Sequence, residues 1–99
     1  MHKDLKVPVV ELPEYCRRNA IRRLDLFGSA TGADFGPDSD IDLLVEFRPE
    51  AAIGFLALSR MQRELSDLFG RRVDLVPRGG LKPVIASSVL MEAEPLYAE

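Results

Sequence analysis

A Gly-Ser pair, followed by ten residues and then by two aspartates that flank one apolar residue, constrains this chain more than any other feature. The aspartates, Asp40 and Asp42, begin a segment rich in branched and aromatic residues that predicts a β-strand over residues 40–47. Because side chains alternate between the faces of a strand, both carboxylates project from one face, about 6.5–7 Å apart. Two carboxylates at this spacing can share one cation or bind two neighbouring ones.

The paired carboxylates also indicate which cation suits them. Without a cation the two groups would repel each other, and burial would disfavour ionising both. Mg²⁺ takes oxygen ligands and usually binds one or two protein carboxylates, while water and substrate phosphates fill its other positions. The pair therefore favours a magnesium–nucleotide site over a structural metal site.

The Gly-Ser pair, Gly28 and Ser29, lies between an apolar segment that predicts a strand over residues 23–27 and a short helix predicted over residues 29–32. Glycine allows a ligand to approach the backbone, and serine is a favourable N-cap residue. The free N–H groups of such a strand-to-helix turn bind phosphate. A Gly-Ser pair alone usually closes a plain turn, so the phosphate site is favoured only in combination with the aspartates.

The motif Gly28-Ser29-x10-Asp40-x-Asp42 resembles the signature of the polymerase-β-like nucleotidyltransferase superfamily. The short chain looks like its minimal nucleotidyltransferase branch, the MntA-type antitoxins of HEPN/MNT toxin–antitoxin modules. The likeness continues through residues 70–76 and covers most of the chain from about residue 24 onward. It implies an α+β fold with the palm-like core of that superfamily.

The resemblance also implies a nucleotide site and a metal site. Three residues would contact the nucleotide (Gly28, Ser29 and Ser39), and three would bind metal and catalyse (Asp40, Asp42 and Asp74). In the family the carboxylates hold two Mg²⁺ ions, and ATP is the substrate. Asp74 lies in a predicted strand over residues 72–76, where the alternative is a solvated carboxylate on an edge strand. Family members often carry Arg-Gly where this chain has Gly32 and Ala33, so affinity for triphosphate is expected to be lower.

In MntA-type systems the reaction is AMP transfer from ATP to a tyrosine of a HEPN-domain toxin. The resemblance therefore implies a protein adenylyltransferase that acts as an antitoxin in a hetero-oligomer with such a toxin. Two alternatives remain open: an antitoxin that neutralises its toxin by binding alone, and a nucleotidyltransferase with a small-molecule acceptor. No motif residue of the family falls on Asp25, for which a surface or structural role is expected.

Length, charge and cysteine content indicate the number of domains, the kind of partner and the cellular location. The 99 residues predict one domain spanning 1–99, with residues 1–10 extended or mobile. A net charge of −3 argues against direct nucleic-acid binding. The single Cys16 fits a reducing cytoplasm, and we expect no membrane span and a cytoplasmic location.

The remaining pattern predicts a small mixed sheet covered by helices on one side. Helices are expected over residues 13–20, 53–69 and 82 or 83–91, and residues 33–39 form a loop rich in turn residues. The long helix carries apolar residues at helical spacing on one face (Phe55, Leu58, Met61, Leu65 and Leu68). Apolar residues near the C-terminus either close the core or form a docking surface (Val84, Ile85, Val89, Leu90, Met91, Leu96 and Tyr97).

Overall fold

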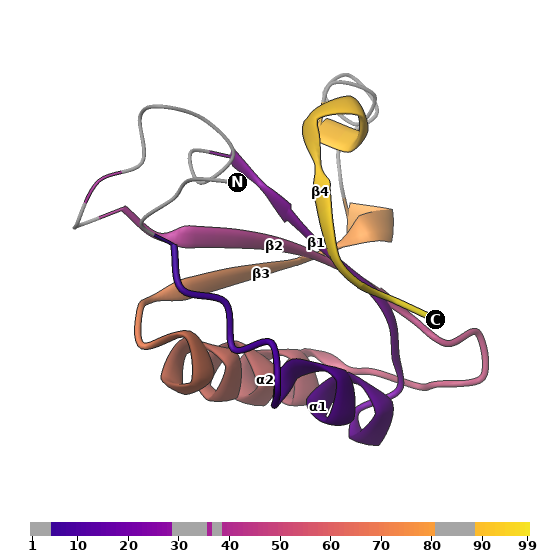
Figure 1. The fold of residues 1–99 in the computed structure, drawn as a ribbon. Coiled ribbons are helices and arrows are strands. Elements are labelled where there is room, and N and C mark those ends of the chain that lie inside the picture. Colours follow the sequence, from indigo (N-terminus) through magenta and orange to yellow (C-terminus); the bar gives the residue numbers. More distant parts are fainter. Residues whose placement is uncertain (1–4, 29–35, 37–38, 81–88) are drawn as a thin grey trace.

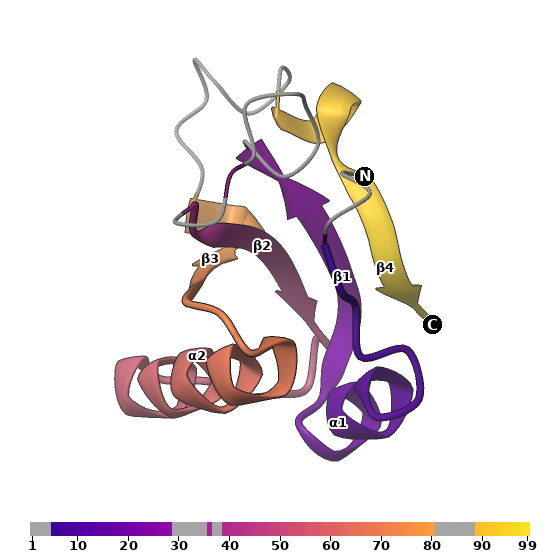
Figure 2. The same ribbon diagram turned by 60° about the vertical axis from the view of Figure 1, so that its left-hand side comes forward.

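A computed structural model describes residues 5–28, 36, 39–80 and 89–99 of the chain. Its centre is a four-stranded mixed sheet in the order β3-β2-β1-β4, with both α-helices on one face (Figures 1 and 2). The strands are β1 (Ile21–Phe27), β2 (Ile41–Phe47), β3 (Val73–Pro77) and β4 (Glu94–Ala98). The helices are α1 (Leu12–Arg18), α2 (Phe55–Phe69) and the short 3-10 helix η2 (Arg78–Gly80).

The connections explain the mixed sheet. β1 pairs antiparallel with β2 and with β4, whereas β2 pairs parallel with β3. A parallel pair needs a long crossover, which α2 supplies. The prediction of an α+β fold with a small mixed sheet flanked by helices is therefore confirmed.

The predicted boundaries shift by a few residues. α1 ends at Arg18 instead of residue 20, and Ala20 takes a left-handed backbone conformation (φ 57°) that turns the chain into β1. β1 then starts at Ile21, two residues earlier than predicted. The predicted helix over residues 29–32, most of the loop over 33–39, and the first part of the C-terminal helix lie outside the described residues; residues 89–92 are helical.

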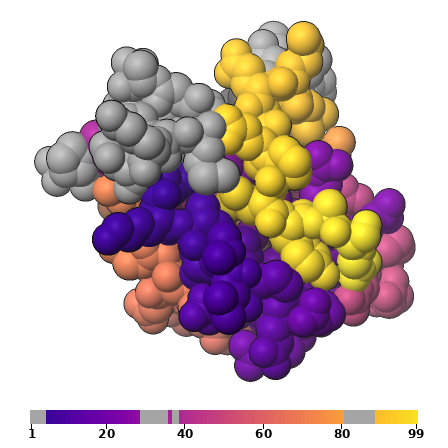
Figure 3. Space-filling model, in the orientation of Figure 1, coloured from indigo at the N-terminus to yellow at the C-terminus, as the bar shows by residue number. Residues whose placement is uncertain are grey.

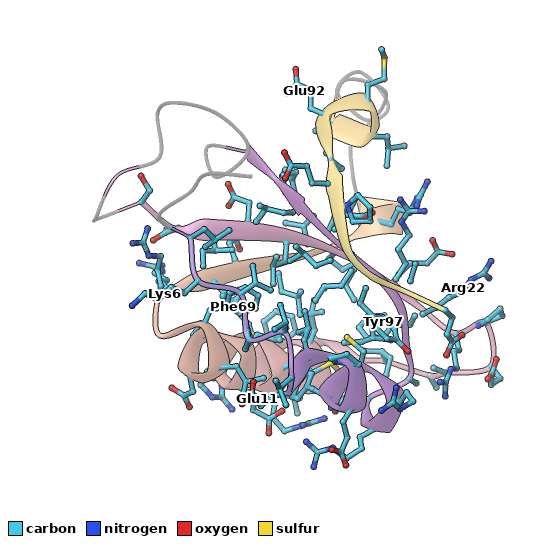
Figure 4. All side chains as sticks on the ribbon, viewed as in Figure 1. Lys6, Glu11, Arg22, Phe69, Glu92 and Tyr97 are labelled. Atoms are coloured by element: carbon cyan, nitrogen blue, oxygen red, sulfur yellow. The ribbon has the colours of Figure 1, made fainter. Side chains whose placement is uncertain are left out.

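The sequence pattern missed β4. Glu94–Ala98 forms an edge strand beside β1, and it lies at the surface next to α1 (Figure 3). Leu96 and Tyr97 pack against the core, which supports core closure at these two positions over a docking surface. Tyr97 is labelled in Figure 4.

The core fills the space between the sheet and the two helices. α2 contributes Met61, Leu65 and Phe69 to it, and Phe69 is labelled in Figure 4. The prediction that Phe55 also faces the core is wrong, because its side chain is 79% exposed at the start of the helix. The buried apolar cluster consists of Leu12, Tyr15, Cys16, Ile21, Leu24, Leu26, Ile41, Leu43, Val45, Met61, Leu65, Phe69, Val73 and Leu75.

Polar contacts tie α2 to its neighbours. The Tyr15 hydroxyl of α1 donates a 2.8 Å hydrogen bond to Glu64 Oε1. At the outer edge of β3, the backbone N–H of Val73 donates to Ser66 Oγ (2.9 Å), and that of Leu75 donates to Gln62 Oε1 (2.8 Å). Side chains of α2 thus satisfy two donors that an edge strand would otherwise expose.

Neither α1 nor α2 covers the opposite face of the sheet, and we refer to it as the open face (Figure 1). Asp25 lies there and is only 2% exposed. Arg23 Nε donates to both of its carboxylate oxygens, at 3.0 and 2.9 Å. In the described part of the chain, the helices are too short or too polar to cross a membrane.

Candidate active site

Asp42 and Asp74 are direct neighbours on adjacent strands. They are register partners in the parallel pair of β2 and β3. The residues on either side of them, such as Ile41 and Val73, are buried in the core, so strand alternation places both aspartates on the open face. The structure thus brings together two carboxylates that lie 32 positions apart in the sequence (74 − 42).

Asp40 lies just before β2 and is exposed. Its Oδ2 atom is 3.9 Å from Arg72 Nε, and the Arg72 side chain is 83% exposed. An ion pair this open to solvent contributes little to stability. Arg72 can therefore move away from Asp40 at small energetic cost when a cation approaches.

The electrostatics of the site centre on Asp42. The pKa of this carboxyl is raised above its ordinary value, chiefly by burial, then by the negative charge of Asp74 and then by that of Asp40. The negative charges of Asp74 and Asp40 therefore reach Asp42 in the folded chain. A bound divalent cation would relieve both the repulsion and the burial cost.

Gly28 lies against Asp42 at the end of β1. Its backbone is left-handed (φ 75°), and a Cβ atom there would collide with Asp42 Oδ2 and lie 3.2 Å from its Cγ. This position therefore requires glycine both for its backbone and for the close approach of the carboxylate. Of the predicted Gly-Ser pair, Gly28 lies beside Asp42, whereas Ser29 lies outside the described residues.

Ser39 takes part in a hydrogen-bonded turn just before Asp40. The N–H of Gly36 donates to Ser39 Oγ (3.0 Å), and the N–H of Ser39 donates to the carbonyl of Gly36 (3.1 Å). Arg71 Nη1 donates to the carbonyls of these two residues, to Gly36 O at 2.9 Å and to Ser39 O at 3.2 Å. The sequence reasoning missed Arg71, because no local pattern shows that it reaches back across more than 30 residues.

The donor set fits magnesium in chemistry. All candidate ligands are carboxylate oxygens, and two of them are already neighbours on one face. Within the described residues, no group of three or more histidine, cysteine, aspartate or glutamate side chains is positioned to hold a metal ion. Joint ligation by Asp40, Asp42 and Asp74 therefore requires side-chain rotation from the arrangement seen here.

A groove of about 690 Å³ lies apart from the carboxylates. It opens around Glu46, four residues beyond Asp42 on β2, and its described lining does not include the three aspartates. Its charged lining consists of Arg22, Arg23, Glu46, Arg78 and Glu99. We assign the site to the carboxylates and not to the groove. Negative charges lie close to Asp42, and Gly28 fits against it, so these residues suit cation binding. The size of the groove alone indicates no chemistry.

Several solved structures share this fold, and two of them illustrate it. A crystal structure described as a toxin–antitoxin with AMP-PNP aligns with a TM-score of 0.73 and 22% identity, covering 93% of this chain and 72% of that one. A structure of a tri-AMPylated Shewanella oneidensis HEPN toxin in complex with its MNT antitoxin aligns with a TM-score of 0.67 and 20% identity, covering 93% and 71%. At these identities the likeness concerns the fold.

Sequence comparison identifies the family. The protein adenylyltransferase MntA of Thermococcus cleftensis is 38% identical over 79 residues, which are 80% of this chain and 78% of the relative. The family model of the nucleotidyltransferase domain matches residues 9–96. The resemblance read from the sequence is confirmed: the chain belongs to the nucleotidyltransferase domain family, as an enzyme homologous to the MntA adenylyltransferases.

Proposed function

We propose that this chain is a magnesium-dependent protein adenylyltransferase that serves as an antitoxin, transferring AMP from ATP to a tyrosine hydroxyl of a HEPN-type toxin. The observation that carries the proposal is the pairing of Asp42 with Asp74 on the open face, beside Gly28. The Thermococcus relative, named a protein adenylyltransferase, supports a protein acceptor. The neighbouring toxin–antitoxin structures, one with AMP-PNP and one with an AMPylated HEPN toxin, support the nucleotide and the partner.

Each site residue has a role in this proposal. The Gly28–Ser29 turn and Ser39 bind the triphosphate through backbone N–H groups and hydroxyls. Asp40 and Asp42 would hold one Mg²⁺, and Asp74 would join them in holding a second. Bound Mg²⁺ would supply charge neutralisation during the transfer.

The reaction is an in-line displacement at the α-phosphate. A bond forms between the tyrosine oxygen and the α-phosphorus, the bond to the bridging oxygen breaks, and pyrophosphate leaves. The exposed Asp74 carboxylate orients the acceptor hydroxyl and takes up its proton. Most of the catalysis comes from positioning and charge stabilisation, as is usual for phosphoryl chemistry.

The setting of this reaction is part of the proposal. The acceptor is another protein chain, and neither nucleic acid nor a membrane takes part directly. The protein acts in the cytoplasm, where ATP is available and the buried thiol of Cys16 stays reduced. Gly32 and Ala33, where family members often carry Arg-Gly, lie outside the described residues, and we expect weak triphosphate affinity.

The test is the intact mass of a co-expressed HEPN partner. With the wild-type chain the partner gains whole AMP units, and with Asp40→Ala/Asp42→Ala it gains none. Asp67→Ala, which removes an exposed carboxylate from α2, is the matched control and preserves the gain.

The other outcomes separate the alternatives. An unmodified partner whose toxicity is still suppressed by the wild-type chain would replace the transferase proposal with neutralisation by binding. AMP found on a metabolite, with the partner unlabelled, would identify a small-molecule acceptor.

A further inference from the structure

Arg71 connects the start of β3 to the turn that precedes Asp40. It lies in the short connection between α2 and β3 and is half-buried. One terminal nitrogen, Nη1, donates to the carbonyls of Gly36 and Ser39, at 2.9 and 3.2 Å. These hydrogen bonds reach across 35 and 32 positions of the sequence, so they fix a tertiary contact.

The contact acts on the backbone immediately before the first catalytic aspartate. Two hydrogen bonds join Gly36 to Ser39, and the guanidinium of Arg71 donates to the carbonyls of both residues. Charge-assisted donors make stronger hydrogen bonds than neutral ones. Arg71 therefore holds the turn at two points that lie three residues apart.

A second bond fixes the other side of Asp40. The N–H of Ile41 donates to the carbonyl of Arg72 (2.9 Å), which begins the parallel pairing of β2 with β3. Asp40 thus lies between two backbone anchors, Ser39 and Ile41, and the consecutive residues Arg71 and Arg72 supply both. Because Asp74 lies two residues after Arg72, on β3, these anchors set the position of Asp40 relative to Asp74.

We infer that Arg71 is a positioning residue, which sets the backbone of Ser39 and Asp40 against β3 so that the first aspartate can join Asp42 and Asp74. The catalytic half of this inference rests on the proposed function. The structural half does not, because it concerns hydrogen bonds of the chain without ligands. Arg72 differs from Arg71, because its side chain is 83% exposed and forms an ion pair with Asp40 at 3.9 Å.

Amide hydrogen exchange in the nucleotide-free protein tests the structural half. In Arg71→Met, which keeps the aliphatic stem but removes the donors, the Ser39 amide is expected to exchange at least about tenfold faster, because the turn opens locally. The Leu43 amide in the middle of β2 keeps its wild-type rate. Arg71→Lys restores most of the protection, and Arg63→Met, at an exposed arginine of α2, changes neither amide.

Two outcomes of the exchange experiment would overturn the inference. One is an unchanged Ser39 rate in Arg71→Met. The other is equal acceleration at Ser39 and Leu43, which would mean that Arg71 only supports global stability.

Transfer kinetics test the catalytic half. A loosened Asp40 is expected to lower kcat by about 10–100-fold and to raise the Mg²⁺ concentration for half-maximal rate, because small misplacements of catalytic groups are costly. Arg71→Lys recovers most of the rate, whereas Arg63→Met matches wild type. Faster Ser39 exchange with unchanged kcat and Mg²⁺ dependence would remove the catalytic role. Absence of transfer by the wild-type chain would instead count against the proposed function and leave the exchange result standing.

Discussion

The Asp42 carboxylate lies so close to the backbone of Gly28 that a Cβ atom there would collide with its Oδ2. The end of β1 and the second residue of β2 therefore form one unit, in which the glycine makes room for the carboxylate. Gly28 also has a left-handed backbone (φ 75°), which side chains other than glycine disfavour. The two constraints can be separated experimentally, because Gly70 has a similar backbone (φ 67°) with open space around it.

We predict that Gly28→Ala abolishes transfer while Gly70→Ala does not. Both variants lose about 1–2 kcal/mol of unfolding free energy from the left-handed backbone. Gly28→Ala also displaces Asp42, so nucleotidyl transfer falls by at least about 100-fold. Urea denaturation and a transfer assay on both variants check this, and equal activity in the two would show that the glycine serves the turn alone.

The raised pKa of Asp42 predicts how stability depends on pH. Between the ordinary pKa of aspartate and the raised value, the folded chain binds more protons than the unfolded chain. The free energy of unfolding of the metal-free protein therefore falls as pH rises through this window, and the cost of the Asp42 charge persists at neutral pH. Asp42→Asn is expected to stabilise the metal-free protein at pH 7 and to lose this advantage in acid.

Thermal unfolding in a chelator, at neutral and acidic pH, measures the Asp42 effect. Added Mg²⁺ should stabilise the wild type and leave Asp42→Asn nearly unchanged, because the variant lacks the charge that the cation neutralises. A neutral-pH destabilisation by Asp42→Asn would show that the carboxylate is needed for folding.

The buried Asp25 depends on Arg23 for its charge partner. Arg23→Met removes the two hydrogen bonds that Arg23 Nε donates to the Asp25 carboxylate, which is 2% exposed. The free energy of unfolding is expected to fall by about 2–3 kcal/mol. The neighbouring Arg22→Met removes a solvent-exposed pair with Glu46 at 3.7 Å and should cost under about 1 kcal/mol. Chemical denaturation of the two variants tests the difference, and equal losses would mean that the burial of Asp25 is unimportant.

Cys16 provides a probe of global unfolding. Its side chain is fully buried, so a reagent cannot reach the sulfur in the folded chain. Burial also raises the pKa of the thiol to about 12, so little of it is present as the reactive thiolate. At pH 8 a thiol reagent should label it at least about 100-fold more slowly than in concentrated urea. Rapid labelling of the native protein would reveal an opening of α1 from the sheet.

The sequence predicted the strands whose side chains alternate clearly, and it missed the strand where they do not. β2 and β3 carry aspartates among branched residues, so the sequence alone indicates both the two-residue alternation of a strand and the face on which the aspartates lie. β4 contains a glutamate and a proline in five residues, and its strand conformation comes from pairing with β1 rather than from local preference. Phe55 fits the helical spacing of the apolar residues, but it is the first residue of α2 and is 79% exposed. Periodicity does not reveal which turn of a helix is buried.

The same distinction holds for the site. The pairing of Asp42 with Asp74 follows from alternation once the two strands are adjacent, and the approach of Gly28 follows from the turn. The burial of Asp25 could not be read from its apolar neighbours, since either face of β1 could have faced solvent. The contact of Arg71 with Ser39 depends on tertiary folding, which local sequence does not encode.

The side chains of α2 that bond to β3 have a consequence for self-association. Val73 and Leu75 direct their N–H groups away from the sheet, toward the place where a strand from a neighbouring molecule would add. Ser66 and Gln62 already accept these protons, so a foreign strand would have to displace both side chains before it gained a single bond at these positions. α2 therefore both contributes to the core and protects the β3 edge from pairing with a strand of another molecule. Replacing Gln62 and Ser66 with alanine would leave these two N–H groups available for such pairing and would favour aggregation.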